Sequence, residues 1–223
     1  MHEFGVAFDA TTPLARRADA SLARYMHTSP VLLVVSGPSG VGKDSVVRGL
    51  RQSDHPFCFV VTMTDRQPRR GEVEGEDYCF VTTAAFEAMI ARGEFLEYAR
   101  VYDQYKGVPK ASVQRAIQSD RDVLMRLDVQ GAATIRGRVP QATTVFLAPP
   151  SLDVLVQRLR RRAGDTAEQA SERLHTALLE MERVPEFDYV VVNHEGALDR
   201  AVAQVLAIVT AERCRTGREP VRL

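Results

Sequence analysis

The sequence predicts an α/β fold in which a parallel β-sheet is covered by helices on both faces. Short apolar runs rich in β-branched residues alternate along the chain with helical stretches. The first run, residues 31–35, ends at a glycine-rich turn, which is typical of a buried central strand. Strands that alternate with helices favour a parallel sheet, because each helix carries the chain back across the sheet.

Five strands and five helices are predicted from this alternation. The strands are expected at residues 31–35, 57–62, 123–127, 144–147 and 189–192. The helices are expected at residues 44–51, 112–119, 152–161, 168–183 and 198–213. We find no internal repeat and no low-complexity segment.

Residues 62–110 break this rhythm. They are richer in Thr, Gly, Pro and Tyr, and they predict a small mixed-β insertion. Binding sites often lie on loops and subdomains that a rigid scaffold carries. The insertion is therefore the expected site of a second substrate, within one domain spanning residues 30–223.

Composition excludes several classes of function. The 223 residues carry 29 Lys+Arg and 29 Asp+Glu, so the basic excess of a nucleic-acid binder is missing. Three separated cysteines and five histidines show no metal-ligand spacing. No apolar run approaches the roughly 20 residues of a membrane span. We expect a cytoplasmic protein, a monomer or small homo-oligomer, that binds neither nucleic acid nor membrane.

The first 29 residues contain three arginines, three acidic residues and no signal-type apolar core. A transit peptide is the alternative, but this mixture favours a loosely ordered tail.

A phosphate-binding loop follows the first strand and opens a helix. Its residues are Gly37, Pro38, Ser39, Gly40, Val41, Gly42, Lys43 and Asp44, which is the GxxxxGK arrangement in its required context. The glycines let backbone N–H groups converge on phosphate oxygens, and the helix N-terminus adds positive potential. Lys43 is expected to reach the β- and γ-phosphates of a nucleotide.

Asp44 departs from the usual pattern, which has Ser or Thr after the lysine to bind Mg²⁺. A carboxylate is also a hard oxygen ligand, suited to Mg²⁺ directly or through water. It also suits a helix start. We predict a modified magnesium site at Asp44, with Ser45 as a weaker candidate for the missing hydroxyl.

A second anion site is predicted in the insertion. Arg66 and Arg69 are three residues apart across a proline, and two guanidinium groups can converge on one phosphate. The Tyr78 hydroxyl completes the predicted grip. A charged surface loop is the alternative interpretation, and the nearby phosphate-binding loop makes it less favoured.

With these motifs, the chain resembles the guanylate kinases over residues 31–213. The shared motifs, in order, are GPSGVGKD at 37–44, TMTDRQPRRGEVEGEDYCF at 62–80, FLEY at 95–98, YKG at 105–107, DVQG at 128–131, PPS at 149–151 and FDY at 187–189, followed by Asn193. The RxPRxGExxGxDY run is highly specific to that family. The resemblance implies a P-loop kinase that transfers the γ-phosphoryl group of ATP, with Mg²⁺, to GMP.

The resemblance also implies which residues bind GMP. Arg66, Arg69 and Tyr78 would hold its phosphate, and Thr62 and Glu97 would bind guanine. Asp128 would lie near the guanine and the reaction centre, at the carboxyl end of a parallel strand. Guanine presents two N–H donors on one edge, which a carboxylate accepts and which adenine lacks.

Three further positions depart from the family pattern. Lys106 replaces a phosphate-binding tyrosine, so it would bind phosphate as a cation. Val108 replaces a hydroxyl that contacts guanine, and Arg126 replaces an aspartate two residues before Asp128. We expect Arg126 to pair with Asp128 on one face of their strand. Together with Asp44, these three residues make the sequence similar to the subgroup of plant organellar guanylate kinases.

A basic lid is expected at about residues 158–173. Phosphoryl transfer needs positioning and positive charge on the transferring oxygens. By resemblance, Arg158, Arg162 and Arg173 are lid arginines that close over ATP, whereas a solvated helix face remains the alternative for Arg160 and Arg161. Asn193 matches a position near the adenine of ATP.

Two rival functions remain open. A kinase of another small molecule, such as a sugar phosphate, would keep the phosphate-binding loop but has no reason to keep the 66–78 run together with Glu97. A non-catalytic guanylate-kinase-like binding module is the second rival. Such modules usually have an eroded phosphate-binding loop, whereas Lys43 is intact here.

Overall fold

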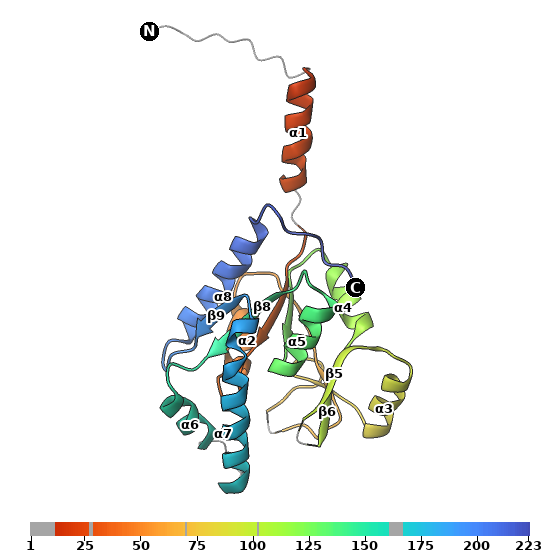
Figure 1. The fold of residues 1–223 in the computed structure, drawn as a ribbon. Coiled ribbons are helices and arrows are strands. Elements are labelled where there is room, and N and C mark those ends of the chain that lie inside the picture. The colour runs from red at the N-terminus through yellow and green to blue at the C-terminus, as the bar shows by residue number, and fades with distance from the viewer. Residues whose placement is uncertain (1–11, 27–28, 70, 102, 161–166) are drawn as a thin grey trace.

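A parallel sheet of five strands forms the centre of the molecule (Figure 1). The computed structural model describes residues 12–26, 29–69, 71–101, 103–160 and 167–223. In the order β2-β7-β1-β8-β9, the strands are Cys58–Val60, Val123–Arg126, Leu32–Ser36, Thr143–Ala148 and Tyr189–Val192. All neighbouring pairs are parallel, which confirms the predicted sheet.

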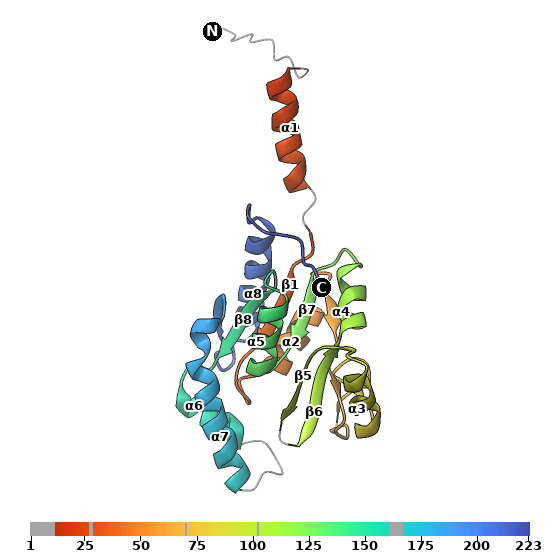
Figure 2. The ribbon, with the colours of Figure 1, turned by 45° about the vertical axis from the view of Figure 1, so that its right-hand side comes forward.

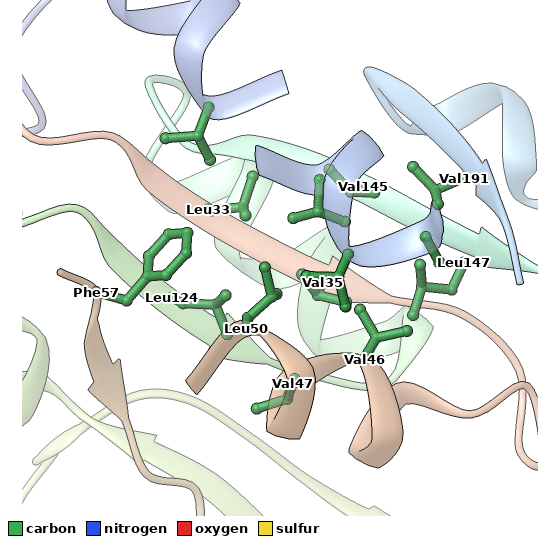
Figure 3. Close-up of a cluster of buried hydrophobic side chains, with 14 of the residues drawn as sticks. Leu33, Val35, Val46, Val47, Leu50, Phe57, Leu124, Val145, Leu147 and Val191 are labelled. Carbon is green, nitrogen blue, oxygen red and sulfur yellow. The ribbon is translucent and has the colours of Figure 1, made fainter. Parts of the chain in front are cut away.

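Helices pack on both faces of this sheet. Alternate residues of β1 point to opposite faces and so contribute to two separate hydrophobic clusters. Leu33 and Val35 face a buried cluster with α2 (Lys43–Gln52) and α8 (Leu198–Arg213), drawn in Figure 3. Leu32 and Val34 instead face α4 (Lys110–Ile117) and α5 (Val129–Arg138). These β1 side chains are fully buried, and each stabilises the fold by about 1.5–3 kcal/mol. The phosphate-binding loop therefore starts from a rigid strand.

Asp122 fixes the beginning of the sheet from a fully buried position. Its Oδ1 accepts a hydrogen bond of 2.8 Å from the backbone N–H of Val31, just before β1. Its Oδ2 lies 2.7 Å from Nε2 of His55 and 2.9 Å from Nε of Arg213 at the end of α8. One carboxylate thus connects β1, β7, α8 and the segment before β2.

The insertion is a second sheet of mixed direction, as predicted. Its order is β4-β3-β6-β5, with strands Cys79–Phe80, Met63–Thr64, Gln104–Pro109 and Phe95–Val101. Helix α3 (Thr83–Ala91), which the sequence analysis did not predict, packs on it. The buried Phe86 ring of α3 stacks on Phe95 and Tyr105, with centroids 4.3 and 5.1 Å apart. This aromatic stack holds the small sheet together.

Two helices, α6 (Leu152–Arg160) and α7 (Ala167–Glu182), follow β8. They contain the described part of the predicted lid, and Arg162 lies outside the described residues. A 3₁₀ turn at Val184–Glu186 leads into β9. The predicted tail contains helix α1 (Pro13–Met26), which projects away from the sheets in Figures 1 and 2. Among the described helices, none combines the length and apolar character that a membrane span requires.

Candidate functional site

The phosphate-binding loop lies between β1 and α2, as its sequence predicts. Gly42 has a φ of +98°, and an added Cβ there would lie only 2.4 Å from Nδ2 of Asn193. This position therefore requires glycine for both conformation and space. The Lys43 ammonium donates hydrogen bonds to the carbonyls of Gly37, at 2.5 Å, and Pro38, at 3.1 Å. Burial lowers the pKa of Lys43, although neighbouring carboxylates oppose the change.

Asn193 and Arg158 hold this loop through hydrogen bonds to its backbone. The buried Asn193 side chain donates from Nδ2 to the Val41 carbonyl at 2.8 Å. The Arg158 guanidinium donates to the same carbonyl at 3.1 Å and to the Asn193 carbonyl at 3.0 Å. Arg158 thus connects α6 to the phosphate-binding loop and to the end of β9.

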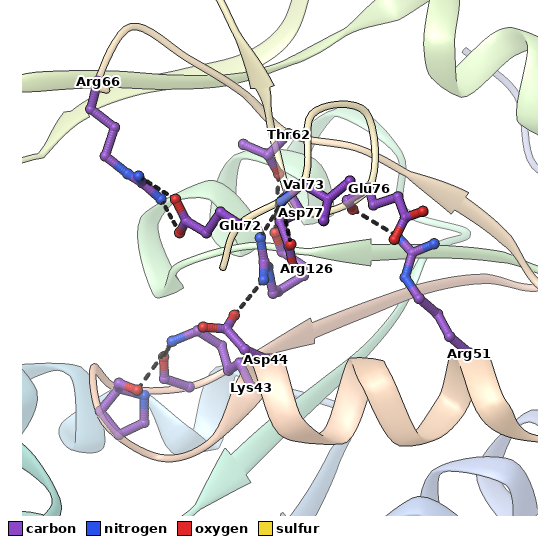
Figure 4. A network of polar contacts seen from close by, with 12 residues as sticks. Lys43, Asp44, Arg51, Thr62, Arg66, Glu72, Val73, Glu76, Asp77 and Arg126 are labelled. Carbon is purple, nitrogen blue, oxygen red and sulfur yellow. Dashed lines mark hydrogen bonds and ion pairs between the residues drawn. The ribbon is translucent and has the colours of Figure 1, made fainter. Parts of the chain in front are cut away.

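The predicted second anion site contains a network of side chains, shown in part in Figure 4. Both terminal nitrogens of Arg66 donate to the carboxylate of Glu72, at 2.6 and 2.5 Å. Glu72 also accepts from the Arg69 backbone N–H at 2.7 Å. The Arg66 guanidinium lies 4.6 Å above the Tyr78 ring, a cation–π contact. Glu72 therefore fixes the Arg66 guanidinium, which in turn lies against the Tyr78 ring.

Glu97 is a buried carboxyl group, only 4% exposed, on β5. Desolvation by burial, with the negative charge of Asp128, raises the pKa of Glu97 to about 8. A Cβ added at Gly131 would lie 3.0 Å from Glu97 Oε2, so the start of α5 leaves just enough room for the carboxyl group. Asp128 caps this helix by accepting from the Gly131 N–H at 2.8 Å. The raised pKa favours the neutral form of the Glu97 carboxyl group at pH 7.

One cavity of about 520 Å³ joins the two predicted phosphate sites. The predicted residues that line it are Pro38, Ser39, Gly40, Gly42, Lys43, Asp44, Thr62, Arg66, Arg69, Tyr78, Glu97, Lys106, Asp128, Arg158 and Arg173. Gly37, Val41 and Asn193 lie beside it rather than in its lining. Desolvation lowers the pKa of Lys106, and Asp128 opposes that shift. A cavity with this many cationic groups suits an anionic ligand.

Glu72 and Glu180 are lining residues that sequence reasoning did not select. Glu72 belongs to the motif at residues 62–80, and its position six residues after Arg66 could have indicated that the two side chains pair. Glu180 lies on α7 and gave no sequence signal. Burial raises the pKa of Glu180, against the opposing charge of Lys43.

The predicted ion pair between Arg126 and Asp128 is wrong. Arg126 Nη1 pairs with Asp44 Oδ1 instead, as Figure 4 shows. The prediction assumed that both residues lie on one strand, but β7 ends at Arg126. Asp128 already belongs to the N-terminus of α5, so its side chain turns to cap that helix.

Comparison with known proteins agrees with this geometry. A protein-family model described as "Guanylate kinase" matches residues 29–212. The chain is 45% identical over 195 residues to a chloroplastic/mitochondrial guanylate kinase 2 of Oryza sativa subsp. japonica, covering 87% of this chain and 68% of the rice protein. It is also 45% identical over 191 residues to a guanylate kinase of Nitrosomonas europaea, covering 86% and 94% of the two chains.

A solved structure shows the same arrangement of elements. The crystal structure of a guanylate kinase from Anaplasma phagocytophilum superimposes with a TM-score of 0.71 at 29% sequence identity. The superposition covers 86% of this chain and 90% of that one.

Proposed function

The chain belongs to the guanylate kinase family, and we propose that it transfers the γ-phosphoryl group of ATP to GMP, giving ADP and GDP. The observation that carries this proposal is the single cavity lined both by Lys43 of the phosphate-binding loop and by the cluster of Arg66, Tyr78 and Glu97. A nucleotide on each side would bring the donor and acceptor phosphates together. Positioning of this kind supplies much of the catalysis in phosphoryl transfer.

The acceptor half of the cavity suits GMP. Arg66 and Arg69 would bind the GMP phosphate, with the Tyr78 hydroxyl as a further donor. Glu97 would accept the two N–H donors of guanine, and Thr62 would contact the same base. Because the pKa of Glu97 is about 8, GMP at pH 7 must bind with loss of the Glu97 proton. Adenine lacks the donor pair that would favour this ionisation.

The donor half suits the triphosphate of ATP. Backbone N–H groups of the phosphate-binding loop would hold the phosphates, and Lys43 would exchange its carbonyl partners for phosphate oxygens. Arg158, Arg162 and Arg173 are proposed to add positive charge from the lid. The acceptor oxygen of GMP is already anionic, so the transfer needs no general base.

Mg²⁺ is the proposed cofactor, bound together with ATP. Asp44 would hold it, directly or through water, because its carboxylate is 68% exposed in the first turn of α2 beside Lys43. Bound Mg²⁺ would neutralise phosphate charge during transfer. If this holds, then at saturating GMP Asp44→Ala raises the Mg²⁺ concentration needed for half-maximal activity, and Asp44→Ser brings that concentration back towards the wild-type value. Superimposable magnesium titrations would remove Asp44 from the metal site.

The reaction is proposed to take place in the cytoplasm. The free cysteines Cys58, Cys79 and Cys214 are compatible with a reducing compartment.

A coupled assay of ADP release tests the function. The full chain is incubated with ATP, Mg²⁺ and GMP, AMP, CMP or UMP in turn. We expect kcat/KM for GMP to exceed that for AMP by about 100-fold or more, because a buried carboxyl group left unpaired strongly disfavours the wrong base. Equal use of AMP, or no ADP release with any acceptor, would contradict the proposal.

A further inference from the structure

Two departures from the family pattern, Asp44 and Arg126, contact each other. They are 82 positions apart in the sequence, yet Arg126 Nη1 donates to Asp44 Oδ1. Asp44 lies in the first turn of α2, directly after the lysine of the phosphate-binding loop. Arg126 is the last residue of β7, and its side chain is only 12% exposed. The pair therefore crosses from the donor half of the cavity to the acceptor half.

The same guanidinium also holds the segment before β4. Arg126 Nη2 donates to the Asp77 carbonyl at 2.8 Å, and the guanidinium lies 4.6 Å from the centre of the Tyr78 ring. Arg66 lies at the same distance from this ring, so Tyr78 contacts two guanidinium groups. Figure 4 shows Arg126 between α2 and the loop of residues 71–78, hereafter the acceptor loop.

The acceptor loop in turn orients the residues proposed to bind the GMP phosphate. It carries Glu72, whose carboxylate fixes the guanidinium of Arg66. It also carries Tyr78, and it is closed by a 3.0 Å hydrogen bond from the Val73 N–H to Asp77 Oδ2. A shift of the Asp77 carbonyl would therefore move Tyr78 directly and Glu72 through the loop backbone.

We propose that Arg126 is a positioning residue which, held by Asp44, fixes the acceptor loop against α2 in the geometry that binds GMP. Asp44 orients one end of the guanidinium and leaves the other end directed at the Asp77 carbonyl. The GMP phosphate site thus depends on a residue of the ATP phosphate site that does not belong to the acceptor loop. This inference rests on the proposed function, because GMP is its ligand.

Serine or threonine at position 44 could not make the same contact. A neutral hydroxyl gives Arg126 one weak acceptor, whereas a carboxylate forms a charge-assisted hydrogen bond that is roughly twice as strong. An aspartate at position 126 beside Asp44 would place two negative charges together. The residues at the two positions therefore suit each other as a pair, and neither family residue fits alone.

The test is the affinity of the full chain for GMP, measured by calorimetry in EDTA and without ATP. The variants are Asp44→Asn, Asp44→Glu, Arg126→Gln and the double variant Asp44→Asn/Arg126→Gln. Arg92→Gln is the matched control, because it removes an arginine from an exposed ion pair, with Glu94, and neither residue lines the cavity. Without Mg²⁺, a metal role of Asp44 cannot alter the result.

We expect Asp44→Asn to weaken GMP binding about fivefold, as for other residues in one ion-pair network. Asp44→Glu should recover most of this loss, and the double variant should bind no worse than Arg126→Gln. Arg92→Gln should stay within about twofold of the wild type, as surface substitutions usually do. The exposed position of Asp44 keeps its variants foldable even if Arg126→Gln does not fold.

Unchanged GMP affinity in Asp44→Asn would overturn the inference. So would losses that multiply in the double variant, because independent sites are additive in free energy. Failure of the wild type to bind GMP would instead contradict the proposed function, and this outcome is distinguishable because it needs no variant.

Discussion

The two proposed phosphate sites of this molecule, the donor site and the acceptor site, are built in opposite ways. The donor site is a backbone structure, in which a glycine-rich loop connects the fully buried strand β1 to α2. The acceptor site is a side-chain structure, in which Arg66, Glu72 and Tyr78 hold one another on an insertion whose strands β3 and β4 have only two residues each. Rigidity comes from the scaffold in the first site and from mutual contacts in the second.

This difference predicts how each site responds to substitution. Backbone N–H groups bind any phosphate of suitable shape, so the donor site provides strength without reading a base. The acceptor site is expected to discriminate between bases, because buried polar groups that lose their partners carry a large free-energy penalty. Apart from Asp44, whose side chain contacts Arg126, changes in the donor site should therefore affect turnover or the loop itself. Changes in the acceptor site should affect the choice and affinity of GMP.

The largest expected effect is that of Lys43→Ala. Removing a cation that is proposed to stabilise charge on the transferring phosphoryl group should lower kcat by about 100- to 1,000-fold. The melting temperature should change little, because within the described residues the ammonium donates its hydrogen bonds to carbonyls of its own loop. Steady-state kinetics with GMP and a thermal melt measure kcat and the melting temperature of the variant and the wild type. A correctly folded variant with wild-type kcat would exclude this role.

Glu97→Gln should lower kcat/KM for GMP by a factor that corresponds to a loss of about 2–4 kcal/mol of transition-state stabilisation. In the proposed complex, the substitution places an amide donor where guanine presents its own donors. The matching measurement is kcat/KM for GMP and AMP in both proteins. Unchanged GMP kinetics would mean that the insertion does not read guanine through this residue.

Without nucleotide, Glu97→Gln should gain stability relative to the wild type as the pH rises. The folded pKa of Glu97 is about 8, above its ordinary value of 4.5, so the folded state holds a proton that the unfolded state loses. Between pH 4.5 and pH 8, this difference lowers the free energy of unfolding of the wild type by up to about 1.4 kcal/mol for each unit that the pH rises. The difference in melting temperature between Glu97→Gln and wild type should grow from pH 5 to pH 8 and then level off. A pH-independent difference would refute the raised pKa.

A smaller effect is expected from Gly42→Ala in the donor site. The added Cβ would meet Nδ2 of Asn193 and would occupy a left-handed backbone conformation, with φ at +98°. The free energy of unfolding should fall by about 1–3 kcal/mol. Gly137→Ala, in helix α5 with open space around its Cβ, is the matched control and should not be destabilising. Equal stability of the two variants would show that the donor loop does not need its backbone geometry.

The same contrast explains what the sequence could predict. The donor site follows a fixed spacing because its backbone conformation requires glycine at particular positions, so its residues can be recognised directly. The five core strands follow from hydrophobic runs, and all five are present. Helix α5 was missed because Gly131 and Gly137 weaken its helical pattern, although Val129, Ala132 and Ile135 are buried at a spacing of three residues.

Side-chain partners were harder to predict than elements. Arg126 was expected to pair within its strand, but the end of β7 frees it to meet Asp44, 82 positions away. Glu180 reaches the cavity from α7 through tertiary packing that no local pattern encodes. Contacts between distant segments depend on where each element ends, and element ends are the least predictable feature of a sequence.

Guanine recognition by the ionised carboxylate of Glu97 is tested most directly by proton release on GMP binding. Calorimetry at pH 7 in two buffers of different ionisation enthalpy measures the number of protons released. Because the pKa of Glu97 is about 8 in the empty site, GMP binding should release about one proton, and Glu97→Gln should release far fewer. Tight GMP binding by the wild type with identical enthalpies in both buffers would contradict this recognition.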